Sequence, residues 1–346
     1  MRSGLVAYNE WFGPSVPGYS VELIRGRHNL RARHHGCAVT IGNFDGVHLG
    51  HQAVIRQLAE RAREWHAPSC VVTFEPHPRE YFAPAQAPVR LSRLRDKVAA
   101  LRRLGVDRLL VLRFDRRLVE QSPADFVAEL LIRELGARQV VVGDDFRFGR
   151  GRAGDFSLLA QMGADHGFAV ERATTFSLDG ERVSSTRVRA ALAAGDMASA
   201  ARLLGGPYTI RGRVVHGEKL GRDLGYPTAN LPLRGHQVPV TGVFAVVAWS
   251  DDGRTLPGVA SLGWRPTVAG TVPLLEVHAF DFAGDLYGAH LAVALLERLR
   301  PEVRFDSLAE LTEQMHRDAA AARACLQHHE GARRDGTAPP LQPGGN

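Results

Sequence analysis

The sequence predicts a two-domain α/β protein, in which a parallel sheet flanked by helices is followed by a small antiparallel β-barrel. The chain has 346 residues, which is more than one hydrophobic core usually organises. Strand-like and helix-like segments alternate in its first part, as in α/β folds. From about Tyr208 the pattern changes to short β-rich pieces separated by glycine and proline, which is typical of a barrel.

The first domain is expected to alternate regularly between strands and helices. Strands are predicted over about 37–44, 69–74, 108–114 and 139–143, and helices over about 51–65, 91–104 and 123–135. Apolar runs such as Leu109–Leu112 and Val140–Val142 are typical of parallel strands that are buried on both faces. This order predicts a parallel sheet covered by helices.

The second domain is expected to consist of short strands and one final helix. Strands are predicted over about 208–216, 242–249, 259–262, 274–282 and 290–296, and the helix over about 308–326. Gly205-Gly206-Pro207 cannot continue a helix and marks a boundary. We therefore expect domains over 21–203 and 207–328 and an atypical extension over 1–20. The polar residues 329–346, rich in glycine and proline, are expected to be disordered.

Composition argues against several classes of protein. The three cysteines are too few and too scattered for a disulfide framework or a cysteine-based zinc site, which favours a reducing cytoplasm. No apolar run reaches the roughly 20 residues of a membrane span, and no signal core follows the first residues. The net charge of +6 raises nucleic acid as a partner, but the basic residues are almost all arginine, which we attribute to genome composition. We expect neither a membrane nor a nucleic-acid partner, and a homo-oligomer stays open.

The segment Thr40–His51, TIGNFDGVHLGH, is the strongest candidate site in the first domain. It follows a buried strand, at the end where open α/β sheets bind ligands. Gly42 and Gly46 allow close backbone approach, while His48 and His51 are predicted to share one face of the next helical turn. Because a helix N-terminus attracts anions, the pair is predicted to donate hydrogen bonds to phosphate. Histidines that only fill a turn are the alternative, and a zinc site lacks a third ligand nearby.

In the second domain, two segments carry polar residues with a candidate role. In an extended Pro227-Thr228-Ala229-Asn230, the threonine and asparagine point to the same face, so their oxygens can converge on one hard cation such as Mg²⁺. The preceding glycines have turn formation as their alternative explanation. Glu276 alternates with apolar residues, and such a carboxylate is costly unless it has a task or a partner. The alternative is a glutamate on the barrel surface.

Several of these segments, in order, resemble the bacterial bifunctional riboflavin kinase/FAD synthetase family. His48-Leu49-Gly50-His51 resembles the H-x-G-H signature of the nucleotidyltransferase superfamily. The blocks TFEPHPRE (73–80), VGDDFRFG (142–149), VSSTRVR (183–189) and PTAN (227–230) are similar to those of the family. The resemblance spans about residues 22–328 and implies a Rossmann-like nucleotidyltransferase domain followed by a riboflavin kinase barrel.

For the first domain, the resemblance implies adenylylation of FMN to FAD with ATP. His48 and His51 would steady the triphosphate and the developing negative charge. The other nucleotide or phosphate contacts that it implies are Gly42, Asn43, Phe44, Asp45, Gly50, Arg182, Ser185, Thr186 and Arg187, and the flavin side comprises Pro76, His77, Pro78 and Asp145. Asp145 has a loop ion pair with Arg147 or Arg150 as its alternative. Ser185 or Thr186 is also a natural helix cap, a role compatible with phosphate contact.

For the second domain, the resemblance implies phosphorylation of riboflavin from Mg-ATP. Thr228 and Asn230 would bind the metal-nucleotide, and Glu276 would activate the ribityl hydroxyl as general base. The phosphate-covering residues implied are Gly212, Gly217, Lys219, Gly221, Arg222, Gly225 and Pro227, and Arg304 is a flavin-side contact. Where the family commonly has Gly-x-Asn-Pro-Thr, this chain has Arg265 in place of asparagine, which keeps donors but loses the acceptor.

We therefore predict a bifunctional enzyme of flavin cofactor biosynthesis, with riboflavin, FMN and ATP as substrates and Mg²⁺ as cofactor. One alternative is an adenylyltransferase with a degenerate kinase barrel. Another is a basic RNA-binding or regulatory module on the same folds. The stacked aromatic pattern of such a module is not evident, since aromatic residues make up only 7% of the chain.

Overall fold

The computed structural model describes residues 21–334 except 218–220, 222–223, 234–236 and 268–269. Two predicted site residues, Lys219 and Arg222, lie outside the described residues, as do the expected extension over 1–20 and residues 335–346 of the expected tail. The described chain forms two compact units. One comprises residues 21–88 and 92–184, and the other comprises 89–91 and 185–334 with the gaps given above.

The first unit is built on a six-stranded sheet in which every pairing is parallel. The strands lie in the order β1-β4-β3-β2-β5-β6. Their bounds are β1 (Glu22–Arg25), β2 (Ala38–Ile41), β3 (Ser69–Glu75), β4 (Arg108–Arg113), β5 (Gln139–Val142) and β6 (Ala169–Arg172). From β2 the chain adds β3 and β4 on one side, and later β5 and β6 on the other. The order thus reverses between β2 and β5, and open sheets bind ligands at the carboxyl ends of strands at such a reversal.

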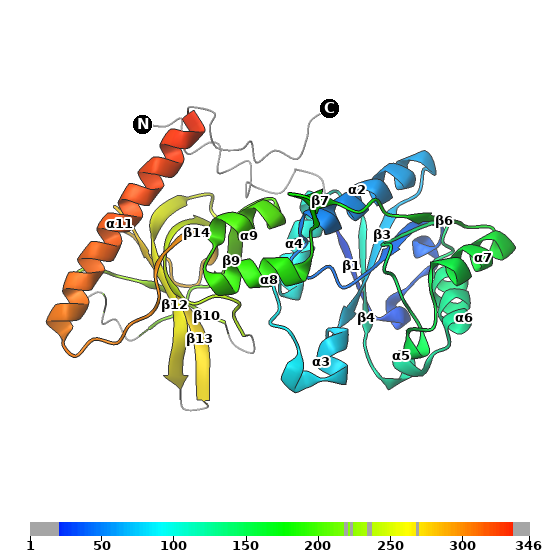
Figure 1. Ribbon diagram of the computed structural model, residues 1–346, viewed down its shortest axis with the longest axis horizontal. Helices are drawn as coiled ribbons and strands as arrows, with labels where there is room; N and C mark the ends of the chain where they lie inside the picture. Colours follow the sequence, from blue (N-terminus) through cyan, green and yellow to red (C-terminus); the bar gives the residue numbers. More distant parts are fainter. Residues whose placement is uncertain (1–20, 218–220, 222–223, 234–236, 268–269, 335–346) are drawn as a thin grey trace. The chain divides into compact units, whose positions relative to one another are not determined.

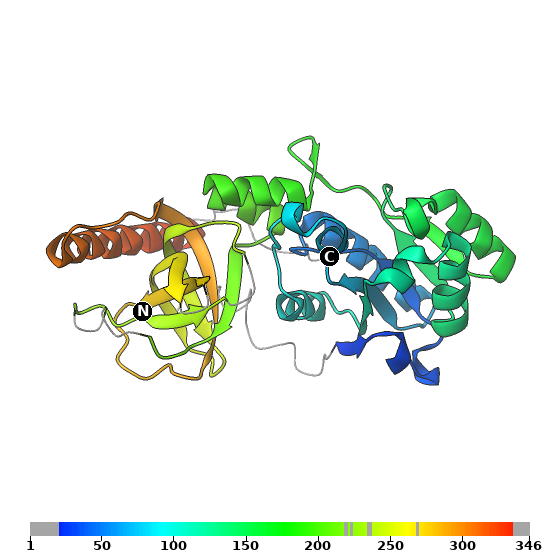
Figure 2. The same ribbon diagram turned by 90° about the horizontal axis from the view of Figure 1, so that it is seen from below.

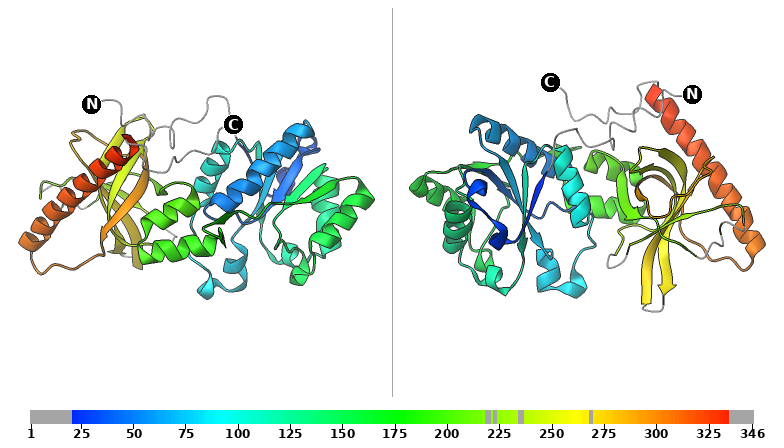
Figure 3. Two further views of the ribbon diagram at one scale, coloured as in Figure 1. Left: turned by 45° about the horizontal axis from the view of Figure 1, so that its top comes forward. Right: turned by 180° about the vertical axis from the view of Figure 1, so that it is seen from behind.

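Helices cover both faces of this sheet (Figures 1 and 3). The helices are α2 (Leu49–Glu64), α3 (Pro78–Phe82), α4 (Leu94–Arg103), α5 (Arg116–Glu120), α6 (Pro123–Phe126), η4 (Val127–Glu134) and α7 (Phe156–His166). Shorter elements are η1 (Arg27–Asn29), η2 (Ala32–His34), η3 (Pro84–Gln86), η5 (Arg150–Arg152), β7 (Ser177–Leu178) and β8 (Glu181–Arg182). Val71 packs in one core with Leu58 of α2, whereas Val72 packs in the other with Leu130 of η4. Both faces are buried, which explains the continuous apolar runs of the strands.

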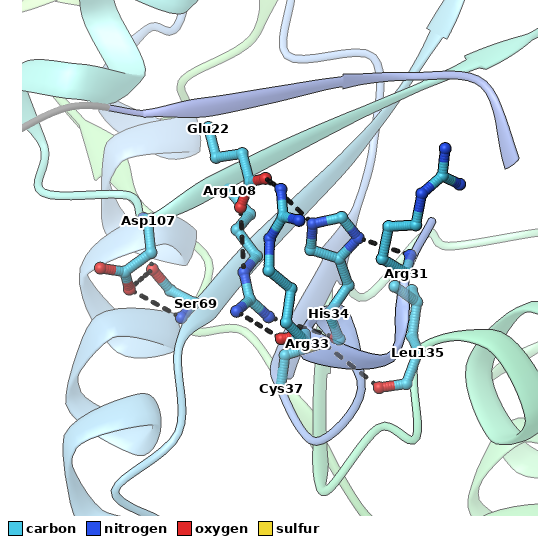
Figure 4. Close-up of polar contacts among 9 residues, drawn as sticks. All are labelled: Glu22, Arg31, Arg33, His34, Cys37, Ser69, Asp107, Arg108 and Leu135. Carbon is cyan, nitrogen blue, oxygen red and sulfur yellow. Dashed lines mark hydrogen bonds and ion pairs between the residues drawn. The ribbon is translucent and has the colours of Figure 1, made fainter. Parts of the chain in front are cut away.

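A polar network joins the amino ends of the strands, opposite the loops that carry the predicted site (Figure 4). Glu22 of β1 lies 3.0 Å from the Nε2 atom of the buried His34. Arg108 at the start of β4 donates to the His34 carbonyl at 3.1 Å. Asp107 accepts hydrogen bonds from the backbone N–H and the hydroxyl of Ser69, at 2.8 and 2.7 Å. The network fastens β1, β3 and β4 at this end, so its role is structural.

The second unit is an antiparallel sheet that curls into an open barrel. Its order is β10-β13-β12-β11-β14-β9, with β9 (Tyr208–Arg213), β10 (Ala229–Pro232), β11 (Gly242–Ser250), β12 (Thr255–Thr267), β13 (Gly270–Ala279) and β14 (His290–Arg300). The backbone N–H of Val215 donates to the Asn230 carbonyl at 2.9 Å. The chain that follows β9 thereby meets β10 in an isolated bridge, so the two ends of the sheet come together. Phe244, Leu262 and Leu275 are fully buried in this unit.

Among the described residues of this unit, three longer helices accompany the barrel. α8 (Ser185–Ala194) and α9 (Met197–Leu204) precede it, and α11 (Leu308–Arg334) follows it. α9 ends at Gly205, whose φ of +74° is a left-handed conformation that glycine adopts freely. α11 runs alongside the barrel in Figure 2, and its residues Ala322 and Leu326 share a core cluster with Val247 and Trp249. The last helix therefore closes one face of the sheet.

The predicted fold class is confirmed in both halves of the chain. Helices α7 and α9 were not predicted, and the other errors lie at element ends and edges. α2 begins at Leu49 instead of about His51. β12 runs over Thr255–Thr267, far beyond the predicted 259–262. The four-residue edge strands β1 and β6 were not predicted, since short half-exposed strands leave little periodicity. α11 continues to Arg334, so 329–334 is helical where we expected disorder.

Candidate active sites

The loop after β2 places two histidines at the N-terminus of α2. His48 is the N-cap of the helix, and its Nδ1 atom accepts the backbone N–H of His51 at 3.3 Å. The two imidazole rings stack, with centroids 3.6 Å apart and an interplanar angle of 18°. Because Nδ1 of His48 accepts this hydrogen bond, the neutral form of the ring carries its proton on Nε2. Both rings therefore gather at the positive end of the helix.

His51 is the more chemically distinctive member of the pair. Its Nδ1 atom is buried without a hydrogen-bond partner in the part of the chain that the structure describes. Burial of the ring, followed by the charges of His48, Lys97 and Arg182, holds the pKa of His51 well below its ordinary value. The ring is thus neutral near pH 7 and offers one donor and one acceptor. A buried ring nitrogen without a partner is costly, which fits a site that a ligand completes.

The backbone of this loop is tightly constrained. Phe44 has a φ of +47°, a left-handed conformation that costs of order 1–3 kcal/mol in a residue other than glycine. The Phe44 ring lies edge-on to His51, with centroids 5.2 Å apart. A Cβ on Gly42 would lie 3.1 Å from that phenyl ring, and one on Gly50 would lie 3.1 Å from the Val183 carbonyl. Glycine at both positions thus permits the close packing of the loop.

Asp45 is buried and serves the loop itself. Its Oδ1 atom accepts hydrogen bonds from the backbone N–H of Ser92 at 3.0 Å and from the Ser92 hydroxyl at 3.4 Å. The backbone N–H of Gly46 donates to the same hydroxyl at 2.9 Å. These bonds tie the loop to the segment before α4. A nucleotide contact by Asp45 stays a prediction.

Lys97 is a further residue of this site that the sequence analysis did not select. It lies on α4, is 7% exposed, and donates from Nζ to the Asn43 carbonyl at 2.6 Å and to the Thr73 hydroxyl at 3.1 Å. The buried ammonium of Lys97 thereby fixes the backbone of the loop at Asn43. Its position on the apolar face of a helix concealed it. The feature of the sequence that could have identified Lys97 is the rarity of lysine, since Lys97 and Lys219 are the only lysines in the sequence.

The loops that follow β5 and β6 bring two more predicted residues together. Arg182 lies 3.1 Å from Asp145 and 3.4 Å from Asp144. Arg147 instead pairs with Asp155 at 3.2 Å, so the alternative in which Asp145 pairs with Arg147 or Arg150 is wrong about the partner. Arg182 also contributes to the lowered pKa of His51. Asp145, Arg182 and the histidines therefore belong to one neighbourhood, at the reversal between β2 and β5.

The flavin-side block follows β3 and forms α3. His77 is the N-cap of this helix, since its Nδ1 atom accepts the backbone N–H of Arg79 at 3.2 Å. Pro78 is the first helical residue, and Pro76 precedes the cap. Tyr81 and Phe82, the last two residues of α3, are exposed, and both rings lie edge-on to Phe114 at 5.5 and 5.7 Å. The exposed aromatic rings extend the predicted block, and the sequence analysis did not select them.

The hydroxyl residues of the VSSTRVR block lie at the start of α8. The helix begins at Ser185, so Ser184 precedes it and Ser185, Thr186 and Arg187 form its first turn. The expected cap at Ser185 or Thr186 is therefore placed one or two residues too late. These residues belong to the second unit, and their predicted phosphate contacts stay predictions.

In the barrel, Asn230 and Glu276 lie directly opposite each other on two paired strands. Asn230 of β10 is the register partner of Glu276 of β13, and directly opposed residues of paired strands project from the same face. Thr228 immediately precedes β10, and its carbonyl accepts the Nδ2 of Asn230 at 3.3 Å. Glu276 is 26% exposed and lies 2.8 Å from Arg265. Glu276 is thus not an isolated surface glutamate.

The glycines before β10 allow the chain to pass close to this pair. A Cβ on Gly217 would lie 2.5 Å from the Nδ2 atom of Asn230, and one on Gly221 would lie 2.4 Å from the Tyr226 carbonyl. The structure also describes four other residues of the predicted set. Gly212 packs against Leu231, and Gly225 has a φ of +83°. The Pro227 carbonyl lies 3.0 Å from His278 Nδ1, and Arg304 is exposed between β14 and α11. Close approach, and not turn formation alone, explains Gly217 and Gly221.

A thiol and a carboxylate meet where α11 crosses β14. Cys325 donates to Glu297 at 3.1 Å. Burial, followed by the neighbouring Glu297 carboxylate, raises the pKa of Cys325 to about 12. His329 lies on the same side of α11, and the ligand atoms of the three residues lie within 4.8 Å of one another. With its proton held, the thiol joins the helix to the strand as a hydrogen-bond donor.

Comparison with known proteins relates both units to flavin cofactor enzymes. Residues 30–187 match the FAD synthetase family, and residues 204–326 match the riboflavin kinase family. The bifunctional riboflavin kinase/FMN adenylyltransferase of Pseudomonas fluorescens is 54% identical over 305 residues, which cover 88% of this chain and 97% of that protein. The protein of the same name from Escherichia coli (strain K12) is 51% identical over 304 residues, covering 88% and 97%.

A solved structure extends the similarity to the whole fold. It is described as a macrolide-efflux protein from Streptococcus pneumoniae, and it matches with a TM-score of 0.75 and 30% identity over 88% of this chain and 99% of that one. In the described part of this chain, no helix is both long and apolar enough to cross a membrane. Two matched regions in the expected order, and relatives that align along nearly their full length, lead to one conclusion: the chain belongs to the bifunctional riboflavin kinase/FMN adenylyltransferase family.

Proposed function

We propose that this protein phosphorylates riboflavin in residues 207–328 and adenylylates the resulting FMN in residues 21–203, with ATP as the donor in both reactions. The observation that carries the proposal is the stacked pair His48 and His51 at the N-terminus of α2, beside the reversal of the parallel sheet. Such a position binds phosphate groups through helix N–H groups and ring donors. The family membership supplies the second reaction.

In the first reaction centre, a phosphate oxygen of FMN attacks the α-phosphorus of ATP. The new P–O bond forms while the bond to pyrophosphate breaks, and pyrophosphate leaves with the electron pair. The protein contributes positioning and neutralisation of charge more than covalent chemistry. His51 is neutral because its pKa is lowered. It donates a hydrogen bond to the developing charge, and it carries no charge of its own that solvent would have to stabilise. Arg182 and Lys97 add positive charge to the same neighbourhood.

The flavin of FMN occupies the side of the sheet that carries α3. Tyr81 and Phe82 expose their rings there, and aromatic faces stack on flat heterocycles. His77 and Pro78 fix the start of the helix and so hold these rings in position. Asp145, held by Arg182, belongs to the same reaction centre, in the loop that follows β5.

In the barrel, Glu276 takes the proton of the ribityl hydroxyl as its oxygen attacks the γ-phosphorus of ATP, and ADP leaves. Thr228 and Asn230 present hard oxygen donors near this carboxylate, a donor set that suits Mg²⁺. A Cβ on Gly217 would meet the Asn230 amide at 2.5 Å, so only glycine leaves that amide unobstructed. When bound, Mg²⁺ neutralises phosphate charge. Glu276 orients and deprotonates the acceptor hydroxyl.

Reciprocal variants test the assignment of one reaction to each domain. His51→Ala should slow FAD formation from FMN by about 10²–10³-fold, the usual effect of removing a donor to transition-state charge, while riboflavin is still converted to FMN. Glu276→Gln should slow riboflavin phosphorylation strongly and spare the conversion of added FMN. His166→Ala and Glu313→Gln, at exposed positions of the same two units, serve as controls.

Separation of the flavins over time distinguishes the outcomes. If the unaltered protein converts FMN to FAD but never phosphorylates riboflavin, the barrel is degenerate and the bifunctional assignment fails. If His51→Ala abolishes phosphorylation and spares adenylylation, the two chemistries have been assigned to the wrong domains.

A further inference from the structure

We propose that Arg265 is a positioning residue of the kinase centre: it holds the Glu276 carboxylate in its reactive place, and Glu302 holds Arg265. This inference rests on the proposed role of Glu276 as general base. It concerns the residue at which this chain departs from the asparagine common in the family.

The guanidinium of Arg265 bridges two carboxylates. Its Nη2 atom donates to Glu276 Oε2 at 2.8 Å, and its Nη1 atom donates to Glu302 Oε1 at 3.4 Å. Arg265 is 44% exposed, Glu276 26% and Glu302 33%. A rigid planar fork with separate donors can fix two carboxylates in a defined geometry, which the point charge of lysine cannot do.

Strand register explains how Arg265 reaches a residue that is not its neighbour. β12 and β13 pair Ser261 with Glu276, Gly263 with Leu274 and Arg265 with Val272. Since side chains alternate along a strand, Ser261, Gly263 and Arg265 share one face of β12. Gly263 therefore lies between Arg265 and the position opposite Glu276, and its lack of a side chain leaves room there for another group.

The space above Gly263 is occupied by Glu302. A Cβ built on Gly263 would lie 1.8 Å from Glu302 Oε1, so the carboxylate rests where the side chain of any other residue would stand. Glu302 thus reaches Arg265 from the segment after β14. Glu302 therefore contacts Arg265, and Arg265 contacts the reactive carboxylate of Glu276, while Gly263 leaves the space that Glu302 occupies.

The arrangement serves orientation more than stability. Partly exposed ion pairs contribute little to folding, and the long side chain of Arg265 would otherwise be free to move. Glu276 accepts from Arg265 through one oxygen, which directs the other oxygen of the carboxylate. A general base must lie within hydrogen-bond reach of the proton that it removes, and small misplacements of reacting groups slow reactions strongly.

The test is the steady-state kinetics of riboflavin phosphorylation by the full-length chain. Arg265→Asn should lower kcat by roughly 10- to 10²-fold, as expected when a reacting group is misplaced, with the KM for ATP and for riboflavin nearly unchanged. Arg265→Lys should restore only part of the rate, because charge returns without the fork. Arg254→Asn removes another partly exposed arginine of the same barrel, paired with Asp252, and should leave phosphorylation unchanged.

Two further variants link the effect to Glu276 and Glu302. In a Glu276→Gln background, Arg265→Asn should cause almost no additional loss, because residues that act as a unit are not additive. Gly263→Ala should displace the flexible Glu302 carboxylate and lower kcat in the same direction by a smaller factor. Denaturant unfolding of each variant, compared with the unaltered chain, shows whether its barrel is folded, and conversion of added FMN to FAD checks that the first domain is intact. Gly263→Ala keeps the proposal testable should Arg265→Asn fail to fold.

Three results would overturn the inference. A raised KM for ATP at unchanged kcat would make Arg265 a nucleotide-binding residue. Full additivity with Glu276→Gln would make it act independently of the base, and an Arg265→Asn variant as active as Arg254→Asn would remove any role. Failure of the proposed function looks different: Glu276→Gln would itself phosphorylate riboflavin at the normal rate.

Discussion

Lys97→Met is expected to weaken the first domain and to slow FAD formation while sparing FMN formation. The lysine is 7% exposed, and its ammonium donates to the Asn43 carbonyl at 2.6 Å and to the Thr73 hydroxyl at 3.1 Å. Methionine fills the volume of the lysine stem, so little packing is lost. The change therefore isolates the ammonium and its hydrogen bonds.

The magnitude follows from two opposing effects. Hydrogen bonds that involve a charged group contribute about 1.5–3 kcal/mol, whereas removing a buried cation recovers part of its desolvation cost. The Asn43 carbonyl also keeps the Thr73 hydroxyl as a donor, at 3.2 Å. We expect the free energy of unfolding to fall by about 1–2 kcal/mol, which corresponds to about 2–4 °C in Tm per kcal/mol for a domain of this size.

The same variant should affect chemistry through Asn43 and His51. The Asn43 backbone belongs to the loop that carries the histidines, so losing its support misplaces them. The assay is denaturant unfolding of the first domain together with the rates of both reactions. Arg103→Met, an exposed cation on the same helix, is the matched control. Unchanged stability and unchanged adenylylation in Lys97→Met would refute the reasoning, and so would an equal loss of riboflavin phosphorylation.

Three further outcomes are expected. The pKa of His51 is lowered in the folded protein, so the free energy of unfolding has its full value at pH values above the ordinary histidine pKa of about 6.5. At lower pH it decreases by up to about 1.4 kcal/mol per pH unit. His51→Gln should flatten this slope in denaturant titrations between about pH 5 and 6.5. Gly217→Ala should lower riboflavin phosphorylation only, since its Cβ would meet Asn230 at 2.5 Å; equal loss of adenylylation would contradict this. Cys325, with a pKa of about 12, should react with iodoacetamide roughly 10³-fold more slowly at neutral pH than an ordinary thiol, and Glu297→Gln should accelerate the reaction; an unchanged rate would show that Glu297 is not responsible.

The sequence by itself determined the order of the two domains and selected the segments that are proposed to carry the sites. Strands buried on both faces produce long apolar runs, and a barrel produces short β-rich pieces between turns. The fold of each half can therefore be predicted from a local sequence pattern. The histidines of TIGNFDGVHLGH and the Thr228–Asn230 pair were also found, because their meaning lies in spacing along a single segment. Boundaries were less accurate, since helix starts depend on caps such as His48.

Only the tertiary structure decided which distant residues meet. Lys97 reaches Asn43 across 54 positions of sequence, and Arg265 reaches both Glu276 and Glu302, whose carboxylate lies where a side chain at Gly263 would stand. Asp145 pairs with Arg182, not with Arg147 or Arg150 nearby in sequence. Such contacts are set by sheet order and register, which no local pattern encodes. The charge around His51, and the lowering of its pKa, follow from that assembly and from burial in it.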